Sequence, residues 1–245
     1  MSIKGKVFVI TGGSSGLGKA MAIEMVNRGA NVVINGRREL ELAEAAKEID
    51  PSGKQVWFVA GDVGDPKTAK RLIDDSVAHF GRIDTLVNNA GIFISKPFTE
   101  YSEEDFETYI STNVVGFFHV TQQAVAEMLK QGTGHIVTIT TSLVDQPSTS
   151  VPSVLASLTK GGLKSATKSL AIEYASRGIR VNAVAPGIIK TPMHPVESHE
   201  ALASLHPMGR MGEAHEIVDA VLYLDSANFV TGETLYVDGG QNAGH

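Results

Sequence analysis

Short runs of apolar and β-branched residues recur along the chain, and between them apolar residues return every three or four positions. Helical spacing of this kind is clear at Leu17, Met21 and Met25, and again from Ala69 to Phe80. The alternation predicts an α/β fold in one domain, a doubly wound sheet of parallel strands with helices on both faces. Seven strands are expected, at residues 7–10, 32–34, 56–59, 83–87, 136–139, 181–184 and 235–237.

Two features mark where the helices end and where a ligand could bind. Gly29 and Gly81 follow helical patterns, where a residue with positive φ is favoured. One segment, about 187–209, departs from the alternation and is rich in proline and histidine. It follows the sixth predicted strand, so we expect a mobile flap at the carboxyl edge of the sheet, where open α/β sheets bind ligands.

No linker or repeat divides the chain, so residues 1–245 are predicted to form a single domain.

Composition narrows the classes of function. The net charge of −6 is spread among interspersed acids and bases, which argues against nucleic acid as a partner. The chain has no cysteine, so disulfides and thiolate chemistry are excluded. No apolar run approaches the roughly 20 residues of a membrane span, and the N-terminus lacks a signal-peptide pattern. We therefore expect a cytoplasmic protein that does not enter the membrane.

A glycine-rich turn follows the first predicted strand directly and runs into the first helical pattern. It reads Thr11-Gly12-Gly13-Ser14-Ser15-Gly16-Leu17-Gly18. Such a turn lets backbone N–H groups approach a pyrophosphate at a helix N-terminus, where the helix dipole also favours negative charge. A tight turn with no ligand is the alternative interpretation of the glycines alone.

The spacing TGxxxGxG resembles that of the short-chain dehydrogenase/reductase family. The likeness extends in order over nearly the whole chain, through Asp62-Val63, Asn88-Asn89-Ala90-Gly91, Asn113, Lys160-Gly161-Gly162, Pro186-Gly187 with Thr191, and Val237-Asp238-Gly239-Gly240. The resemblance implies a Rossmann fold and an oxidoreductase that interconverts a carbonyl and an alcohol, a small-molecule substrate, by hydride transfer with a nicotinamide cofactor.

The resemblance also implies a set of cofactor contacts. Asp62 and Val63 are expected at the adenine, Lys160 at the ribose, and Ile188 and Thr191 at the nicotinamide amide. The full expected set is Gly12, Ser14, Ser15, Gly16, Leu17, Gly18, Arg37, Arg38, Asp62, Val63, Asn88, Asn89, Ala90, Gly91, Lys160, Pro186, Gly187, Ile188 and Thr191.

The end of the second strand bears on the choice of cofactor. NAD-preferring relatives place an acid there to bind the ribose hydroxyls. In this chain the position is Gly36, followed by Arg37 and Arg38. A guanidinium can meet a 2′-phosphate with a charge-assisted contact, whereas a carboxylate would repel it. NADP(H) is therefore predicted in preference to NAD(H), the alternative being two solvated arginines.

The expected catalytic residues show a gap. The family uses a Tyr-x-x-x-Lys pair, in which the tyrosine passes a proton to the carbonyl oxygen. Counting back four from Lys160 gives Ala156, and no tyrosine lies between Tyr109 and Tyr174. The family's serine corresponds to Thr141 by the strand pattern and to Ser142 or Leu143 by counting from position 156. Asn113 matches the asparagine that anchors water near the lysine.

Three interpretations of the gap remain open. The first is an NADP(H)-dependent oxidoreductase in which water or a hydroxyl relays the proton from Lys160. The second is a non-catalytic dinucleotide-binding protein, and the third is an engineered replacement at Ala156. We favour the first, and we expect the small side chain to leave a polar space beside Lys160, Asn113 and Thr141 or Ser142 that could hold water.

Other expectations concern metal, substrate and assembly. His194, His199, His206 and His215 do not have the spacing of a metal site, so no metal is predicted and they are interpreted as exposed flap residues. A partly apolar substrate pocket is suggested by Phe93, Leu143, Val144, Met193, Leu202 and Leu205. The family resemblance implies a homotetramer, because the helical stretches 102–130 and 152–177 resemble those that form the family's four-helix interface. These stretches also carry more apolar residues than one sheet-facing stripe needs, including Phe117, Phe118, Leu163, Leu170 and Tyr174.

Overall fold

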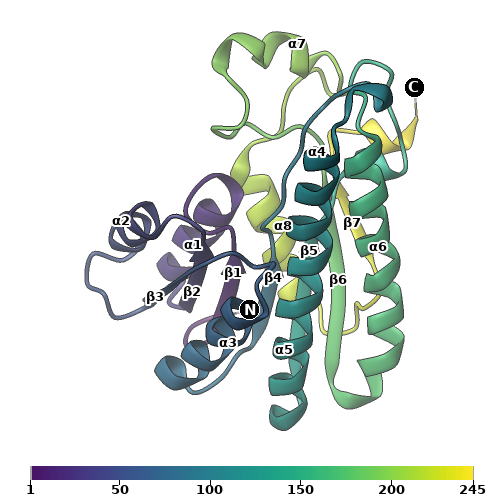
Figure 1. Ribbon diagram of the computed structural model, residues 1–245. Coiled ribbons are helices and arrows are strands. Elements are labelled where there is room, and N and C mark those ends of the chain that lie inside the picture. The colour runs from purple at the N-terminus through teal and green to yellow at the C-terminus, as the bar shows by residue number, and fades with distance from the viewer. Residues whose placement is uncertain (1, 245) are drawn as a thin grey trace.

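The computed structural model describes residues 2–244 and confirms the predicted α/β fold (Figure 1). Seven parallel strands form one sheet in the order β3-β2-β1-β4-β5-β6-β7. The sheet therefore grows outward from β1 and β4 in opposite directions, and the order reverses between these two strands. The strands are β1 (Val7–Thr11), β2 (Asn31–Gly36), β3 (Val56–Ala60), β4 (Thr85–Asn88), β5 (Gly134–Ile139), β6 (Ile179–Pro186) and β7 (Thr234–Val237).

Helices cover both faces of the sheet, as the two hydrophobic cores show. Phe8 and Ile10 of β1 pack in one core with α1, α2 and α8, while Val9 between them packs in the other with α3, α5 and α6. This alternation follows from the two-residue repeat of a strand. The helices are α1 (Gly16–Asn27), α2 (Glu39–Ile49), α3 (Pro66–Phe80), α4 (Glu103–Tyr109), α5 (Gly116–Gln131), α6 (Val154–Tyr174), α7 (His199–Ala203) and α8 (Ala214–Ser226).

The predicted turns and strand ends agree with the structure apart from a few residues. Gly29 and Gly81 have φ values of 84° and 77°, so the expected positive φ at both helix ends is confirmed. The fourth strand begins at Thr85 rather than at the predicted Ile83. The side chain of Gln131 bonds both to the N–H of Ile83 (2.9 Å) and to its carbonyl oxygen (2.7 Å). These contacts occupy the backbone groups that a strand ladder would otherwise use.

The predicted helical stretch 102–130 is not one regular helix. It consists of α4, a π-helical turn at Ile110–Val115, and α5. A π-helical turn contains an extra residue relative to the α-helix, and such turns are frequent at functional sites. Asn113 lies within it and is 2% exposed.

The predicted flap rises above the carboxyl ends of the strands. It leaves the end of β6, contains a short 3₁₀ turn at Val196–Ser198 followed by α7, and returns to α8 (top of Figure 1). The segment is therefore placed over the edge of the sheet where the first strand meets its glycine-rich turn. Its mobility stays a prediction.

Candidate functional site

The glycine-rich turn between β1 and α1 is held against the end of β4. Thr11 Oγ1 accepts hydrogen bonds from the N–H groups of Asn89 (3.0 Å) and Ala90 (2.9 Å). At Gly18 a Cβ atom would stand 2.1 Å from the carbonyl oxygen of Gly12, so the close passage of the helix past the turn requires glycine. Ser15, the N-cap of α1, makes no side-chain capping bond. The N–H groups at the start of α1 are thus available to an anion.

One cavity of about 710 Å³ connects this turn to the far end of the sheet edge. Its wall contains every residue expected to contact the cofactor except Gly18, which lies behind the turn, and Asn88. Asn88 instead lies in the wall of a smaller cavity and donates from Nδ2 to Thr121 Oγ1 at 2.9 Å. The structure therefore brings together nearly all of a site that the sequence spreads over residues 12–191.

The basic end of the large cavity is formed where β2 ends. Gly36 is buried, and a Cβ atom there would lie 3.4 Å from Ser14 Oγ of the glycine-rich turn. Arg37 and Arg38 are exposed and line the cavity. Arg38 pairs with Glu41 at 2.5 Å, whereas Arg37 makes no ion pair with another residue of the described chain 2–244. Arg37 is therefore the cation with its charge available to a ligand.

Lys160 reaches the opposite end of the same cavity from α6. Its Nζ donates to the carbonyl oxygen of Thr140 at 3.1 Å, directly after β5. Burial of the ammonium group lowers the pKa of Lys160 to about 8. Because the charged form is disfavoured by desolvation, this lysine can exchange a proton close to neutral pH.

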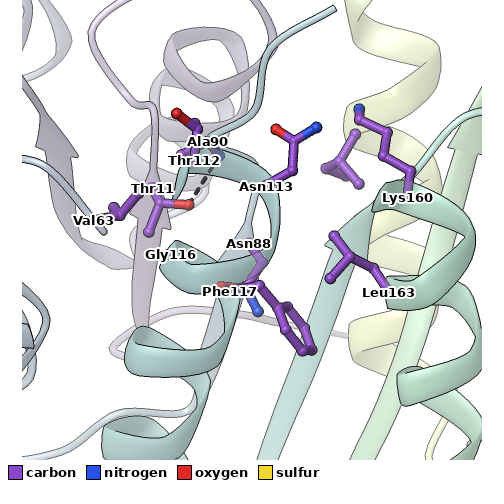
Figure 2. A pocket seen from close by; sticks show the side chains of 11 residues that line it. Thr11, Val63, Asn88, Ala90, Thr112, Asn113, Gly116, Phe117, Lys160 and Leu163 are labelled. Atoms are coloured by element: carbon purple, nitrogen blue, oxygen red, sulfur yellow. Dashed lines mark hydrogen bonds between the residues drawn. The ribbon is translucent and has the colours of Figure 1, made fainter. Parts of the chain in front are cut away.

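A second, small cavity lies between Lys160 and the π-helical turn (Figure 2). Lys160 and Asn113 lie on opposite sides of it, and its volume of about 10 Å³ is close to that needed by one water molecule. The Asn113 side chain accepts from the N–H of Ile92 at 2.9 Å and donates to Thr159 Oγ1 at 3.1 Å. The asparagine side chain thus holds the chain after β4 in place beside the lysine.

Both candidate hydroxyls, Thr141 and Ser142, line the large cavity. Thr141 Oγ1 accepts from the N–H of Leu143 at 3.4 Å, at the start of the 3₁₀ turn Ser142–Val144. Ser142 is fully buried, and its Oγ donates to Oε1 of Gln241 at 2.7 Å. Gln241 also lines the cavity, and it could not be predicted from a motif because it lies directly after the last one, Val237-Asp238-Gly239-Gly240.

Ala156 does not line either cavity. It is fully buried in a small apolar cluster with Tyr109 and Leu155, against which Phe93 and Ile94 pack. The space beside Lys160 is therefore bordered by Asn113, as expected, but not by Ala156, Thr141 or Ser142. The expectation was wrong for Ala156, because the apolar cluster closes around its methyl group, whereas Thr141 and Ser142 share the wall of the large cavity with Lys160.

Two tyrosines, Tyr109 and Tyr236, make hydrogen bonds away from both cavities. Tyr109 is fully buried, and its hydroxyl accepts from the N–H of Ile94 at 2.6 Å; burial raises its pKa to about 12. Tyr236 of β7 donates to Asp145 Oδ2 at 2.5 Å and accepts from Lys164 Nζ at 2.7 Å. Within the described chain, neither cavity has a tyrosine in its wall.

The flap is attached to the sheet edge through a buried histidine. His206 is 4% exposed, so its interpretation as an exposed flap residue was wrong. Its Nε2 accepts from the N–H of Ile188 at 3.0 Å, and its Nδ1 lies 3.1 Å from the carbonyl oxygen of Leu202. His194 and His199 are half-buried, and His194 is part of the cavity wall. His215 is exposed as expected, but it lies at the start of α8 and not in the flap. Of the apolar residues proposed for the pocket, Phe93, Leu143, Met193 and Leu202 line it, and Val144 and Leu205 do not.

The described residues offer neither a metal-binding cluster nor a membrane-spanning helix. Among residues 2–244, no three His, Cys, Asp or Glu side chains are close enough together to hold a metal ion. Over the same residues, no helix has both the length and the apolar character needed to cross a membrane.

Comparison with known proteins gives matches over almost the whole chain. The family described as enoyl-(acyl carrier protein) reductase matches residues 12–242. An uncharacterised oxidoreductase of Thermotoga maritima is 40% identical, with 99% of this chain and 100% of that protein covered. The structure of ElxO with NADP bound has a TM-score of 0.90 at 34% identity, covering 98% of this chain and 99% of that one.

Two other solved structures add information on cofactors. A variant of ElxO in which a tyrosine is replaced by phenylalanine has NADPH bound, with the same TM-score of 0.90 and 34% identity over 98% and 99% of the two chains. The 3-ketoacyl-(acyl-carrier-protein) reductase of Brucella melitensis, in complex with NADH, has a TM-score of 0.91 at 31% identity, covering 98% of this chain and 100% of that one.

Proposed function

Because this chain belongs to the short-chain dehydrogenase/reductase family of oxidoreductases, we propose that it interconverts a carbonyl and an alcohol with NADP(H) as cofactor. The observation that carries the proposal is one large cavity, which joins the glycine-rich turn and Arg37 at one end to Lys160 and Ser142 at the other. A dinucleotide and a small substrate need such a continuous site, with phosphate contacts at one end and reactive groups at the other.

The residues present fit a dinucleotide. The absence of side chains at Gly12 and Gly16, both in the cavity wall, lets the backbone approach a pyrophosphate, and the start of α1 supplies N–H donors. Asp62, with its backbone neighbour Val63, would contact the adenine, and Lys160 would bind the ribose near the reactive end. When bound, the cofactor supplies or accepts the hydride; the chain binds it and orients it.

NADP(H) is proposed over NAD(H) because of the charges at the end of β2. A glycine at position 36 places no carboxylate beside a 2′-phosphate, and Arg37 has no competing ion pair within residues 2–244. Arg38 would contribute less, since its guanidinium is already paired with Glu41. The solved relatives include one with NADP and one with NADH, so the choice rests on these residues.

We propose an atypical proton path, since Ala156 stands where the family places its tyrosine. Lys160 holds a proton that it can release near its pKa of about 8, and the small cavity beside it has room for one water molecule. A water there would carry the proton from Lys160 toward the substrate oxygen. General acid catalysis raises the rate by about 10² to 10⁴-fold, whereas alignment of the reactants can raise it more. Turnover is therefore expected to continue, at a lower rate, with a weaker acid.

A second candidate function is dinucleotide binding without turnover. It is favoured by one observation, that neither cavity has a tyrosine among the described residues of its wall. The cofactor-binding half of the site does not depend on that tyrosine, because the glycine-rich turn, Arg37 and Lys160 are all in place. A sensor or a subunit partner would use the same cavity.

We also propose a homotetramer, in which α5 and α6 form contacts between subunits. Phe118 of α5 is 53% exposed, and Leu158 and Ile172 of α6 are 58% and 83% exposed. Leu163, by contrast, is 7% exposed, and Leu170 and Tyr174 pack partly against the core, so the apolar excess is smaller than the sequence suggested. The mass of the particle at micromolar concentration, measured by light scattering, tests this.

The function itself is tested by two measurements on the unmodified protein. NADPH and NADH are titrated by the change in nicotinamide fluorescence, and turnover is then followed against a panel of ketones and alcohols. Tight NADPH binding with turnover of at least one compound is expected. Tight binding with no turnover across the panel would favour the non-catalytic function, and no binding of either cofactor would contradict both.

A further inference from the structure

The hydroxyl hydrogen of Ser142 is used within the protein. Ser142 Oγ donates to Gln241 Oε1 at 2.7 Å, and the two residues are 0% and 3% exposed. A hydroxyl has one hydrogen to donate, so in this arrangement Ser142 offers the cavity acceptor lone pairs only. A ligand oxygen that needs a donor must find it in another side chain.

Gln241 is placed by the turn that follows β7. The carboxylate of Asp238 accepts from the N–H groups of Gly240 (3.0 Å) and Asn242 (2.7 Å), and the carbonyl oxygen of Asp238 accepts from the N–H of Gln241 at 3.2 Å. Gly239 and Gly240 both have positive φ, 61° and 90°, which makes the turn tight. The position of the Gln241 side chain is therefore fixed at both ends, by this turn and by Ser142.

The amide nitrogen of Gln241 is the free end. This nitrogen donates to no other residue in the described part of the chain. It is also not fully enclosed by protein, so a ligand can reach it. Gln241 lines the large cavity together with Leu143, Met193 and Leu202, at the end where Lys160 lies. Since Ser142 holds the amide oxygen, the nitrogen is the end of the Gln241 side chain that remains to donate to a ligand in this mostly apolar space.

We propose that Gln241 is a substrate-binding residue whose amide N–H donates to the oxygen of an uncharged carbonyl group, and that Ser142 orients it. This deepens the proposed function and rests on it. The substrate class is a neutral ketone or aldehyde with an apolar body, because Leu143, Met193 and Leu202 would surround the body while Gln241 meets the oxygen. A hydrogen-bond donor contributes more binding free energy in a site that excludes water than the same donor does in water.

The test compares two probes that differ in the acceptor oxygen alone. Acetophenone and its alkene counterpart α-methylstyrene are titrated into the NADP⁺ complex, where no hydride is available, and their binding is followed by ligand-observed NMR. The unmodified protein should bind the ketone about fivefold to tenfold more tightly than the alkene, the effect of one net hydrogen bond. Gln241→Met should remove that preference and leave the alkene affinity unchanged.

Two variants separate this role from a structural one. Asn242→Met removes a carboxamide from the same turn outside the cavity wall and should keep the preference for the ketone. Ser142→Ala should reduce the preference by a few-fold, since Gln241 then loses its fixed orientation, and adding Gln241→Met to it should abolish what remains. Melting temperature and NADP⁺ affinity, measured for each variant, identify any that fails to fold.

The outcomes distinguish this proposal from the proposed function. If NADP⁺ does not bind, the proposed function fails, and the same two probes titrated into the protein alone still test Gln241. If the unmodified protein binds ketone and alkene equally, or binds neither up to their solubility, the role of Gln241 is overturned. An unchanged preference in Gln241→Met overturns it as well, whatever the cofactor does.

Discussion

The N–H of Ile188 donates to Nε2 of His206 at a distance of 3.0 Å. This hydrogen bond joins the beginning of the flap to the buried histidine near its end. Since Nε2 is the acceptor, the imidazole must be neutral with its hydrogen on Nδ1, which lies 3.1 Å from the carbonyl oxygen of Leu202. Ile188 lines the large cavity. One buried ring thus fixes the flap to the edge of the cavity.

The first prediction is that His206→Phe destabilises the protein by about 1–3 kcal/mol, the cost of leaving a buried backbone donor without a partner. Urea unfolding of this variant is compared with that of His215→Phe, since His215 is exposed and its replacement should change stability by less than about 0.5 kcal/mol. Equal stability of both variants would show that the Ile188 contact does not hold the flap.

The second prediction is that lowering the pH weakens the contact between Ile188 and His206. Burial lowers the pKa of His206, so the folded state favours the neutral ring more than the unfolded chain does. The stability from this group is present above the unfolded pKa of about 6.5 and is lost as pH falls through the lower folded pKa. The unmodified protein should therefore lose more stability than His206→Phe between pH 7 and pH 5 in urea unfolding. Parallel losses would contradict the assignment.

The third prediction concerns cofactor choice. Arg37→Asp should weaken NADPH binding by about tenfold or more, the value of a charge-assisted contact, and leave NADH within a few-fold. Arg38→Asp is the matched control and should have a smaller effect, because Arg38 is already paired with Glu41. Fluorescence titration of both cofactors measures this. Equal affinity of the unmodified protein for NADPH and NADH would contradict the proposed preference.

The fourth prediction follows from the lowered pKa of Lys160. If Lys160 supplies the proton for carbonyl reduction, its ammonium form is required, so kcat should fall as pH rises above its pKa of about 8. Lys160→Arg stays protonated over this range, so its profile should lack that fall, at a lower overall rate. A fall at the same pH in both proteins would assign the proton to another group.

The sequence alone was enough to predict the parts of the site that lie in contiguous motifs. The turn from Thr11 to Gly18 could be predicted because its spacing and its position after a strand lie within eight residues. The pairing of Ser142 with Gln241 spans 99 positions, and nothing in either neighbourhood signals it. The burial of His206 was missed for a similar reason, since Gly187 and Gly239, which pack on its ring, are distant from it in sequence and nothing in its neighbouring residues signals the contact.

The environment of Ala156 could not be predicted either. Its place on α6, one turn before Lys160, suggested a polar neighbourhood. The structure surrounds it with Tyr109 and Leu155 instead, because the chain after β4 folds back over α6 and packs Phe93 and Ile94 against them. Helical spacing tells which residues share a face, but it does not tell what covers that face.

The last prediction concerns Ala156 directly. Ala156→Tyr should raise turnover of a simple ketone by at least about tenfold, a small part of the range for a general acid, and leave NADPH affinity within a few-fold. The new side chain must enter a closed apolar cluster, so overpacking should lower stability by about 1–3 kcal/mol. Steady-state kinetics, cofactor titration and urea unfolding measure the three effects.

Ala156→Phe is the control that separates the hydroxyl from the volume. It should cost similar stability, because the two rings differ by one oxygen, but it should not raise turnover, because it has no proton to give. A gain shared by both variants would mean that packing near Phe93, and not proton transfer, limits the rate. If Ala156→Tyr binds NADPH normally and reduces no ketone, the site differs from that of a reductase by more than residue 156, and binding without turnover becomes the better account.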